Sequence, residues 1–139
     1  MKTYQLKRAT LFIIMMCIAF SIHYPAEHAS ASTGFQQCGE ASWYKLTGKT
    51  ASGEPADPSG LTGAHRTLPF GTMVDVTNIS NGRTVTIRIN DRGPFSKGRI
   101  IDVTQAAAQQ LGFISKGITT VKVTAHAGEI GTNQIKNCQ

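Results

Sequence analysis

The sequence predicts a mainly β protein, most simply a small closed β-barrel with one short helix. Three observations support this prediction. Short segments alternate apolar and polar residues with the period of a half-buried strand, one segment has the pattern of a helix, and no long repeat is present. A chain of 139 residues has room for one domain, and a closed barrel leaves no exposed strand edges.

The predicted strands are short runs in which apolar side chains face one way. They lie at residues 41–44, 61–65, 73–77, 83–89 and 119–125, with a further short apolar run at 99–101. In the clearest of them, Val85, Ile87 and Ile89 alternate with polar residues. Such a strand buries one face and exposes the other, as expected for the wall of a barrel.

Loop and turn signals separate the strands. Residues 49–60 are rich in glycine, proline, serine and aspartate, which indicates a long loop. Asn81-Gly82 predicts the turn of a hairpin. Residues 90–94 (Asn-Asp-Arg-Gly-Pro) are expected to end the strand before them. The phenylalanines expected to close the ends of the barrel are Phe70, Phe95 and Phe113.

One helix is expected after the apolar run at 99–101. Asp102 or Thr104 is a candidate N-cap, and the helix is expected to extend through Gln110. Gly112 follows, as is typical of a helix end.

The N-terminus has the pattern of an export signal. Basic residues precede an apolar stretch at residues 9–22, which as a helix would span about 21 Å. That is too short for a membrane core about 30 Å thick. Ala29-Ser30-Ala31 fits a signal-peptidase site. We therefore predict a signal peptide at residues 1–31 and an exported protein, periplasmic or secreted, although an uncleaved membrane anchor is the alternative.

The rest of the chain is expected to comprise a loose leader at residues 32–38, the barrel at 39–126 and a polar tail at 127–139. Neither Cys17 nor Cys38 follows the small residues of a lipoprotein-processing site, so no lipid anchor is expected.

Two cysteines, Cys38 and Cys138, remain after removal of the signal. In an oxidising compartment the simplest expectation for such a pair is a disulfide. Two free thiols are the alternative.

The formal net charge of +6 suits a polyanion such as nucleic acid, a membrane surface or an anionic wall polymer. The basic residues are scattered rather than gathered in a motif, so nucleic acid is the least expected partner. The sequence has no metal or phosphate motif, so no cofactor and no metal are expected.

Among the acidic residues, Asp91 stands out. It ends a strongly alternating strand, enters a Gly-Pro turn and is flanked by Arg88 and Arg92. A scaffold can hold such a side chain rigidly at a surface, although Asp91 also suits a plain turn. Glu54 in the long loop could simply be solvated, and His65 could be a structural histidine. Carboxyl groups can supply the proton donor and the charge stabiliser of glycoside cleavage, but spacing alone does not bring these residues together.

Several ordered blocks of sequence resemble the rare lipoprotein A family. They lie at residues 39–44, 50–54, 61–71, 76–78, 81–83, 88–95 and 99–102, so the resemblance covers about residues 39–125. The resemblance implies a six-stranded double-psi β-barrel. It also implies a lytic transglycosylase that acts on peptidoglycan glycan strands, with preference for strands without stem peptides. Such enzymes cleave after N-acetylmuramic acid without water, because the sugar's own hydroxymethyl oxygen closes an anhydro ring. One carboxyl group can then act first as acid and then as base.

The resemblance also implies the site. The family's functional glutamate, histidine and aspartate match Glu54, His65 and Asp91. We assign Asp91 as the acid and base, Glu54 as a charge stabiliser or a residue that tunes Asp91, and His65 as a residue that orients a carboxylate or the substrate. The residues expected to bind the glycan are Trp43, Tyr44, Arg88 and Arg92. A monomer is expected.

Two alternatives remain open at this point. Many family members carry a lipid anchor and a C-terminal glycan-binding domain, and we expect neither here. A non-catalytic module that binds or loosens the wall is one alternative, because residues 101–104 (Ile-Asp-Val-Thr) partly resemble a motif of expansins. A secreted inhibitor or host-directed protein on the same barrel is the other.

Overall fold

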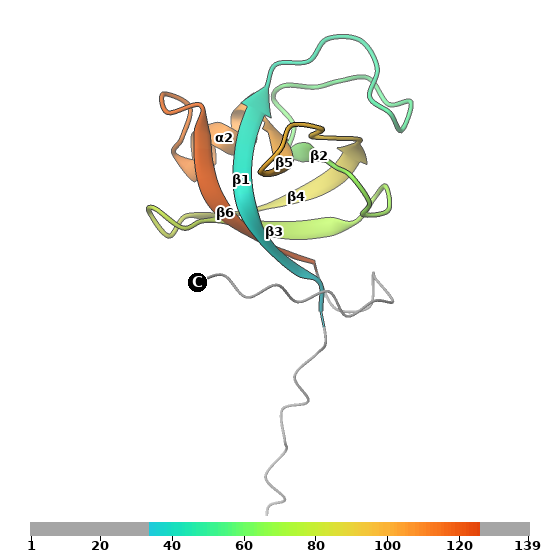
Figure 1. The fold of residues 1–139 in the computed structure, drawn as a ribbon. Coiled ribbons are helices and arrows are strands. Elements are labelled where there is room, and N and C mark those ends of the chain that lie inside the picture. Colours follow the sequence, from blue (N-terminus) through green and yellow to red (C-terminus); the bar gives the residue numbers. More distant parts are fainter. Residues whose placement is uncertain (1–33, 126–139) are drawn as a thin grey trace, which may run out of the picture. The chain divides into compact units, whose positions relative to one another are not determined.

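The computed structural model describes residues 34–125. It forms six strands and one helix (Figure 1). In chain order these are β1 (Gln36–Tyr44), β2 (Thr62–His65), β3 (Met73–Asn78), β4 (Thr84–Asp91), β5 (Arg99–Thr104), α2 (Gln105–Leu111) and β6 (Ile118–Ala125). The predicted signal peptide and the predicted tail at 127–139 lie outside the described residues.

The six strands close into a barrel. Their order around the barrel is β1-β5-β2-β4-β3-β6, and β6 returns to β1. The pairs β1/β5 and β2/β4 are parallel, and the other four pairs are antiparallel. Every strand therefore has a partner on each side, so the barrel exposes no strand edge. The prediction of a small closed β-barrel is confirmed.

Alternation of side chains decides what fills the barrel. In β4, Val85, Ile87 and Ile89 are buried, whereas Thr84 and Thr86 between them are exposed. β3 and β6 follow the same rule, so aliphatic side chains fill the interior. β2 contributes Gly63, where a Cβ would lie 2.7 Å from Cδ1 of Ile87. Close packing therefore requires a glycine there.

Helix α2 packs against β1, β4 and β5 and buries Ala107, Ala108 and Leu111. Its C-terminus is held by the β3–β4 hairpin, because the side-chain amides of Asn78 and Asn81 donate to the Leu111 carbonyl at 3.0 and 2.9 Å. Gly112 follows in the left-handed region and ends the helix as predicted.

Some boundaries differ from the prediction. β1 begins at Gln36, so the end of the expected loose leader pairs with β6. β5 extends to Thr104, because Asp102 and Thr104 alternate with apolar neighbours as in a strand. Thr104 is therefore the N-cap residue of α2, and the interpretation of Asp102 as a helix cap is wrong.

Only one of the three phenylalanines expected to close the barrel does so. Phe113 is 2% exposed, but Phe70 and Phe95 are 42% and 84% exposed. Sequence hydrophobicity did not distinguish them, because Phe70 and Phe95 lie in loops that run outside the barrel wall.

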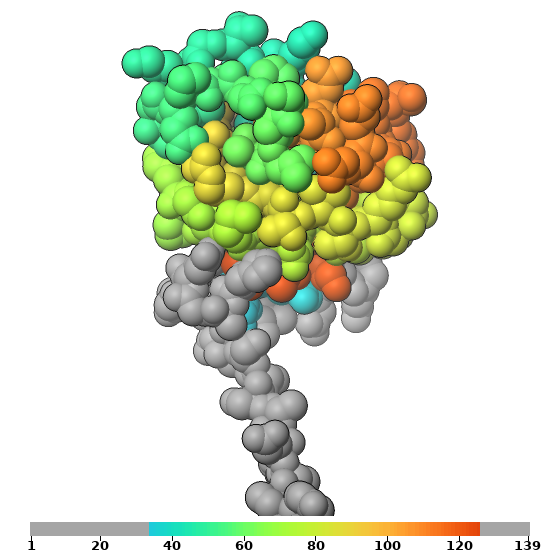
Figure 2. Space-filling view, turned by 180° about the vertical axis from the view of Figure 1, so that it is seen from behind, coloured from blue at the N-terminus to red at the C-terminus, as the bar shows by residue number. Residues whose placement is uncertain are grey.

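The long loop between β1 and β2 was predicted and is present at residues 45–61. It arches above the end of the barrel where β1 ends (Figure 1). From behind, its teal and green atoms cover the upper part of the face above β4 (Figure 2). Hydrogen bonds fix it to the barrel: the Ser52 N–H donates to the Asn90 carbonyl at 3.2 Å, and Thr104 Oγ1 donates to the Gly60 carbonyl at 2.6 Å. The loop is thus placed to complete a surface site.

Candidate active site

The site begins with an irregularity at the end of β4. Gly63 of β2 pairs with Ile89 and Ala64 pairs with Asp91, so Asn90 is an extra residue without a partner on β2. A bulge of this kind bends a strand and redirects its side chains. β4 also continues two residues past its predicted end at Ile89. The side chains of these two residues, Asn90 and Asp91, form hydrogen bonds with the loop at 45–61.

Asp91 is held by one of its two carboxylate oxygens. Its Oδ1 accepts the backbone N–H of Ala51 and of Arg92, each at 2.8 Å. No group within residues 34–125 donates a hydrogen bond to Oδ2. The side chain is therefore fixed in direction by the backbone while one oxygen stays available to a ligand.

Glu54 reaches the same place from the loop. Arg88 donates to both of its oxygens, Nη1 to Oε1 at 2.9 Å and Nη2 to Oε2 at 2.7 Å. Asn90 Nδ2 adds a bond to Oε2 at 3.3 Å. These hydrogen bonds from Arg88 and Asn90 lower the pKa of Glu54 to about 2. Glu54 is consequently ionised at neutral pH and has no proton to donate.

We call Ala51, Glu54, Arg88, Asn90 and Asp91 the Glu54–Asp91 cluster. The two hydrogen bonds from Arg88 to Glu54 anchor the loop, and the backbone N–H of Ala51 in the same loop orients Asp91. The structure thus brings together two of the three predicted functional residues.

His65 has a different environment. Its ring is 3% exposed and lies edge-on to Phe35, with ring centroids 5.6 Å apart. Nδ1 accepts the backbone N–H of Leu68 at 3.1 Å and of Thr67 at 3.3 Å, so Nε2 carries the proton and donates to Oε1 of Gln37 at 3.0 Å. Burial, followed by the positive charges of nearby arginines, lowers its pKa to about 4.

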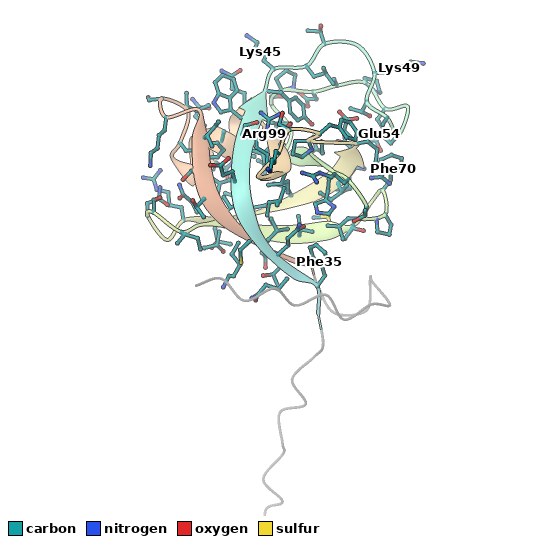
Figure 3. The ribbon with its side chains drawn as sticks, in the orientation of Figure 1. Phe35, Lys45, Lys49, Glu54, Phe70 and Arg99 are labelled. Atoms are coloured by element: carbon teal, nitrogen blue, oxygen red, sulfur yellow. The ribbon has the colours of Figure 1, made fainter. Side chains whose placement is uncertain are left out.

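The ring of His65 therefore lies on the opposite face of β2 from the row that contains Asp91. Neighbouring residues of a strand point to opposite faces. Ala64 pairs with Asp91, whereas His65 pairs with Ile101 of the core and points inward. In Figure 3, Phe35 lies at the start of β1 and Glu54 lies on the flank towards the other end. These contacts fit a structural histidine, and the predicted role of His65 in orienting a carboxylate or the substrate stays a prediction.

A second aspartate lies on the same outer face as Asp91. The register places Ser42, Asp102, Ala64 and Asp91 side by side across β1, β5, β2 and β4. Ser42 Oγ donates to Oδ1 of Asp102, and Arg99 Nη2 lies 3.6 Å from Oδ2. Sequence analysis missed this arrangement, although the alternation in residues 101–104 would have placed Asp102 on a strand.

Tyr44 lies two residues beyond Ser42 and so faces the same side of β1. Its hydroxyl oxygen is buried and has no hydrogen-bond partner within the described range. Burial, followed by the negative charges of Asp91 and Asp102, raises the pKa of this phenol. The hydroxyl is thus a protonated, unpaired donor near two carboxylates, consistent with the predicted role of Tyr44 in binding.

The side chains of the other predicted binding residues form contacts within the protein itself. Trp43 pairs with Val103, packs against the core and donates Nε1 to the Ile114 carbonyl at 3.3 Å. The prediction that it binds substrate is not supported, because alternation turns it inward. Arg92 donates Nη1 to the carbonyls of His65 and Leu68 at 3.2 and 2.9 Å, and its guanidinium lies 3.8 Å from the ring centroid of Phe70. Arg88 is held by Glu54.

Cys38 is disulfide-bonded, and Cys138, its predicted partner, lies outside the described residues. Between residues 34 and 125, no cluster of histidine, cysteine, aspartate or glutamate side chains could hold a metal ion. The same range contains no helix long and apolar enough to span a membrane.

The chain matches a family described as lytic transglycolase over residues 36–123. Curated relatives include the endolytic peptidoglycan transglycosylase RlpA of Neisseria meningitidis serogroup A, which is 52% identical over 92 residues. That match covers 64% of this chain and 38% of the relative. The RlpA protein of Pseudomonas aeruginosa PAO1 is 47% identical over 104 residues, or 73% of this chain and 30% of the relative. The chain therefore matches well under half the length of these relatives.

Solved structures similar to the barrel include the Streptomyces papain inhibitor, with a TM-score of 0.56 and 23% identity over 66% of this chain and 96% of that one. The expansin of Clavibacter michiganensis has a TM-score of 0.57 and 22% identity over 70% of this chain and 53% of that one. At these identities the likeness shows the fold alone, and it identifies the six-stranded barrel as the double-psi type expected from the sequence.

Proposed function

The chain belongs to the lytic transglycolase family, and from that premise we propose that it is an endolytic peptidoglycan lytic transglycosylase. It cleaves glycan strands after N-acetylmuramic acid, leaves anhydro-muramic ends and remodels the cell wall. Relatives of about half identity carry this activity in their names. The observation that carries the proposal is the Glu54–Asp91 cluster, where one carboxylate is held ionised and the other keeps an oxygen open.

In the first step, Asp91 is the acid. Its Oδ2 gives a proton to the glycosidic oxygen while the bond between that oxygen and the anomeric carbon breaks. The sugar ring develops the positive charge of an oxocarbenium-like state. The backbone N–H groups on Oδ1 fix the direction of Oδ2 throughout, so little reorganisation is needed.

In the second step, Asp91 is the base. Its carboxylate takes the proton of the sugar's hydroxymethyl group as that oxygen attacks the anomeric carbon and closes the anhydro ring. Asp91 returns to its acid form, and no water is consumed. A second carboxylate to activate water is therefore unnecessary, which agrees with the pairing of Glu54 to Arg88.

Glu54 acts as a positioning residue. Because Arg88 neutralises its charge and occupies both of its oxygens, it has little capacity to stabilise a cationic sugar directly. It instead anchors the loop that orients Asp91. The Tyr44 hydroxyl is buried near Asp91 and has no partner within the described residues, so its part in binding a sugar oxygen is left to the test of Tyr44→Phe.

The location of the substrate determines the compartment in which the protein acts. Peptidoglycan lies outside the cytoplasmic membrane, so this function requires export, and the signal at residues 1–31 supplies it. The protein acts on its strands as a monomer in the periplasm or after secretion.

The test is digestion of purified sacculi, intact or stripped of stem peptides, followed by mass spectrometry of the released glycan. The wild-type chain is expected to release products with anhydro-muramic ends, more readily from stripped strands. Asp91→Asn is the control, and it should release these products roughly 10²–10⁴-fold more slowly while it keeps the wild-type melting temperature. Unchanged strands with the wild-type chain would identify a wall-binding module, and products with hydrated ends would identify a hydrolase.

A further inference from the structure

Among the large hydrophobic side chains of residues 34–125, that of Phe95 is by far the most exposed to solvent. Phe95 is 84% exposed, whereas the next large hydrophobic side chain, Ile79, is 50% exposed. Single exposed hydrophobic residues are common on protein surfaces, so the meaning of this ring depends on how and where the fold holds it.

The backbone that presents Phe95 is held firmly. Arg66 donates Nε to the Pro94 carbonyl at 2.6 Å and Nη2 to the Ser96 carbonyl at 3.3 Å, and it also donates to the Arg99 carbonyl. These bonds fix the chain on both sides of Phe95. The residues before it, Gly93 and Pro94, are buried. Exposure of the ring is therefore a property of a preorganised loop rather than of a frayed one.

The ring also has a defined place. A Cβ built on Gly93 would lie 3.7 Å from Cε2 and 3.8 Å from Cδ2 of Phe95, so one edge of the ring lies over Gly93. Gly93 follows Asp91 by two residues. Between them, Arg92 stacks on the half-exposed ring of Phe70. In Figure 3, Phe70 lies on the same flank as Glu54. Phe95 thus lies on the loop that directly follows β4, four residues after Asp91, with its ring against Gly93.

From these observations we propose that Phe95 is a stacking platform for a sugar ring of the glycan strand, next to the bond that Asp91 cleaves. The inference rests on the proposed function and adds to it a binding subsite. Pyranose rings present a face of C–H groups, which an aromatic face covers while the hydroxyl groups stay in water. Lys97 follows Phe95 by two residues and is exposed, so the same loop carries a positive charge that suits the carboxylate of N-acetylmuramic acid.

A protein partner fits this surface less well. A stable protein interface needs about 800 Å² from each side, and a single ring among polar neighbours offers much less. One ring is, however, the size that a single sugar requires.

The experiment measures binding apart from cleavage. The full chain with Asp91→Asn is titrated with purified glycan strands that lack stem peptides. Adding Phe95→Ala should raise the dissociation constant roughly tenfold, since the ring loses its stacking partner. Phe95→Trp should bind at least as tightly as the parent, and its added indole fluorescence should shift when strands are present. The matched control is Ile79→Ala, another exposed hydrophobic side chain, at the hairpin end of β4; it should change binding by less than about twofold.

Kinetics give a second measure. With Asp91 intact, Phe95→Ala should raise KM by a similar factor and leave kcat within about threefold, because the platform binds substrate without touching the reacting atoms.

Equal binding of glycan strands by the Phe95→Ala and parent chains would overturn the proposal that Phe95 is a stacking platform. So would a loss of self-association in Phe95→Ala with glycan binding intact, which would identify a second copy as the occupant. If the wild-type chain neither binds nor cleaves strands, the proposed function fails as well; if it cleaves them and Phe95→Ala changes nothing, the platform alone fails.

Discussion

Asp91 and Asp102 lie on the same outer face of the barrel, separated by the small side chain of Ala64. Asp91 is fixed through one oxygen by two backbone N–H groups. Asp102 accepts a hydrogen bond from Ser42 at Oδ1, and its Oδ2 faces the guanidinium of Arg99 in an ion pair at 3.6 Å. The two aspartates in this row of the sheet thus differ in their capacity to contact a ligand. Asp91 keeps one oxygen without a partner in the described residues, whereas both oxygens of Asp102 face side chains of the protein.

The difference shows what makes a carboxylate available for chemistry. Backbone donors orient Asp91 without neutralising it, and the loop that supplies one of them is anchored by a separate ion pair between Glu54 and Arg88. Asp102 instead ties β5 to β1 through Ser42. We therefore infer that Asp91 serves the reaction and Asp102 serves the structure.

The largest expected loss of activity is that of Asp91→Asn, which is compared with the same change at Asp102. Asp91→Asn should lower the rate of anhydro-product release by roughly 10²–10⁴-fold, because it removes the proton donor. Asp102→Asn should lower it by less than about tenfold, yet cost about 1–2 kcal/mol of unfolding free energy by weakening its contacts with Ser42 and Arg99. Product analysis and thermal melts check both. Loss of activity in Asp102→Asn without loss of stability would contradict the comparison.

The inner face of β2 provides the next test, because His65 lies behind this row. His65→Ala should cost about 2–4 kcal/mol, since two backbone N–H groups lose their acceptor and the core loses a ring. His65→Asn should recover part of that cost, because its Oδ1 takes the place of Nδ1. Chemical denaturation of the two variants measures the difference. Equal stability of wild type and His65→Ala would show that the ring is not structural.

His65 also predicts a dependence of stability on pH. Its pKa falls from 6.5 to about 4 on folding, so between these values the unfolded chain binds the extra proton. Stability should therefore fall as the pH drops from 6.5 towards 4. Melting temperatures across this range should show a steeper decline in the wild type than in His65→Asn. Parallel declines would exclude His65 as their cause.

A smaller effect is expected from the anchor of the loop. Glu54→Gln keeps the length of the side chain but loses the charge that pairs with both Arg88 nitrogens. The loop should then hold Asp91 less firmly and kcat should fall by about tenfold. Arg88→Gln serves as the matched control and should have the same effect, because it breaks the same ion pair. A loss as large as that of Asp91→Asn would assign Glu54 to the reaction itself.

The smallest effect is expected at Tyr44, which faces both aspartates. Tyr44→Phe removes a buried hydroxyl that has no partner within the described residues, so the melting temperature should stay the same or rise slightly. KM should rise by roughly three- to tenfold if the hydroxyl binds a sugar oxygen. Unchanged KM with a higher melting temperature would mean that the hydroxyl does not meet substrate.

The sequence alone determined the class of fold and most of the strands, because alternation of side chains is a local property. Val85, Ile87 and Ile89 indicated their strand and its buried face directly. The ordered blocks also pointed to Glu54 and Asp91, which the fold brings together through Ala51, Arg88 and Asn90.

Only the tertiary structure decided which side chains share a surface. An extra residue in β4 carries Asp91 to the loop, and the pairing of β2 with β5 turns His65 inward to the core. Register and bulges depend on contacts between segments far apart in the chain, and a shift of one residue exchanges the two faces of a strand. For that physical reason a local pattern could locate Asp91 and His65 on strands but could not tell which of them lies on the outer face of the barrel.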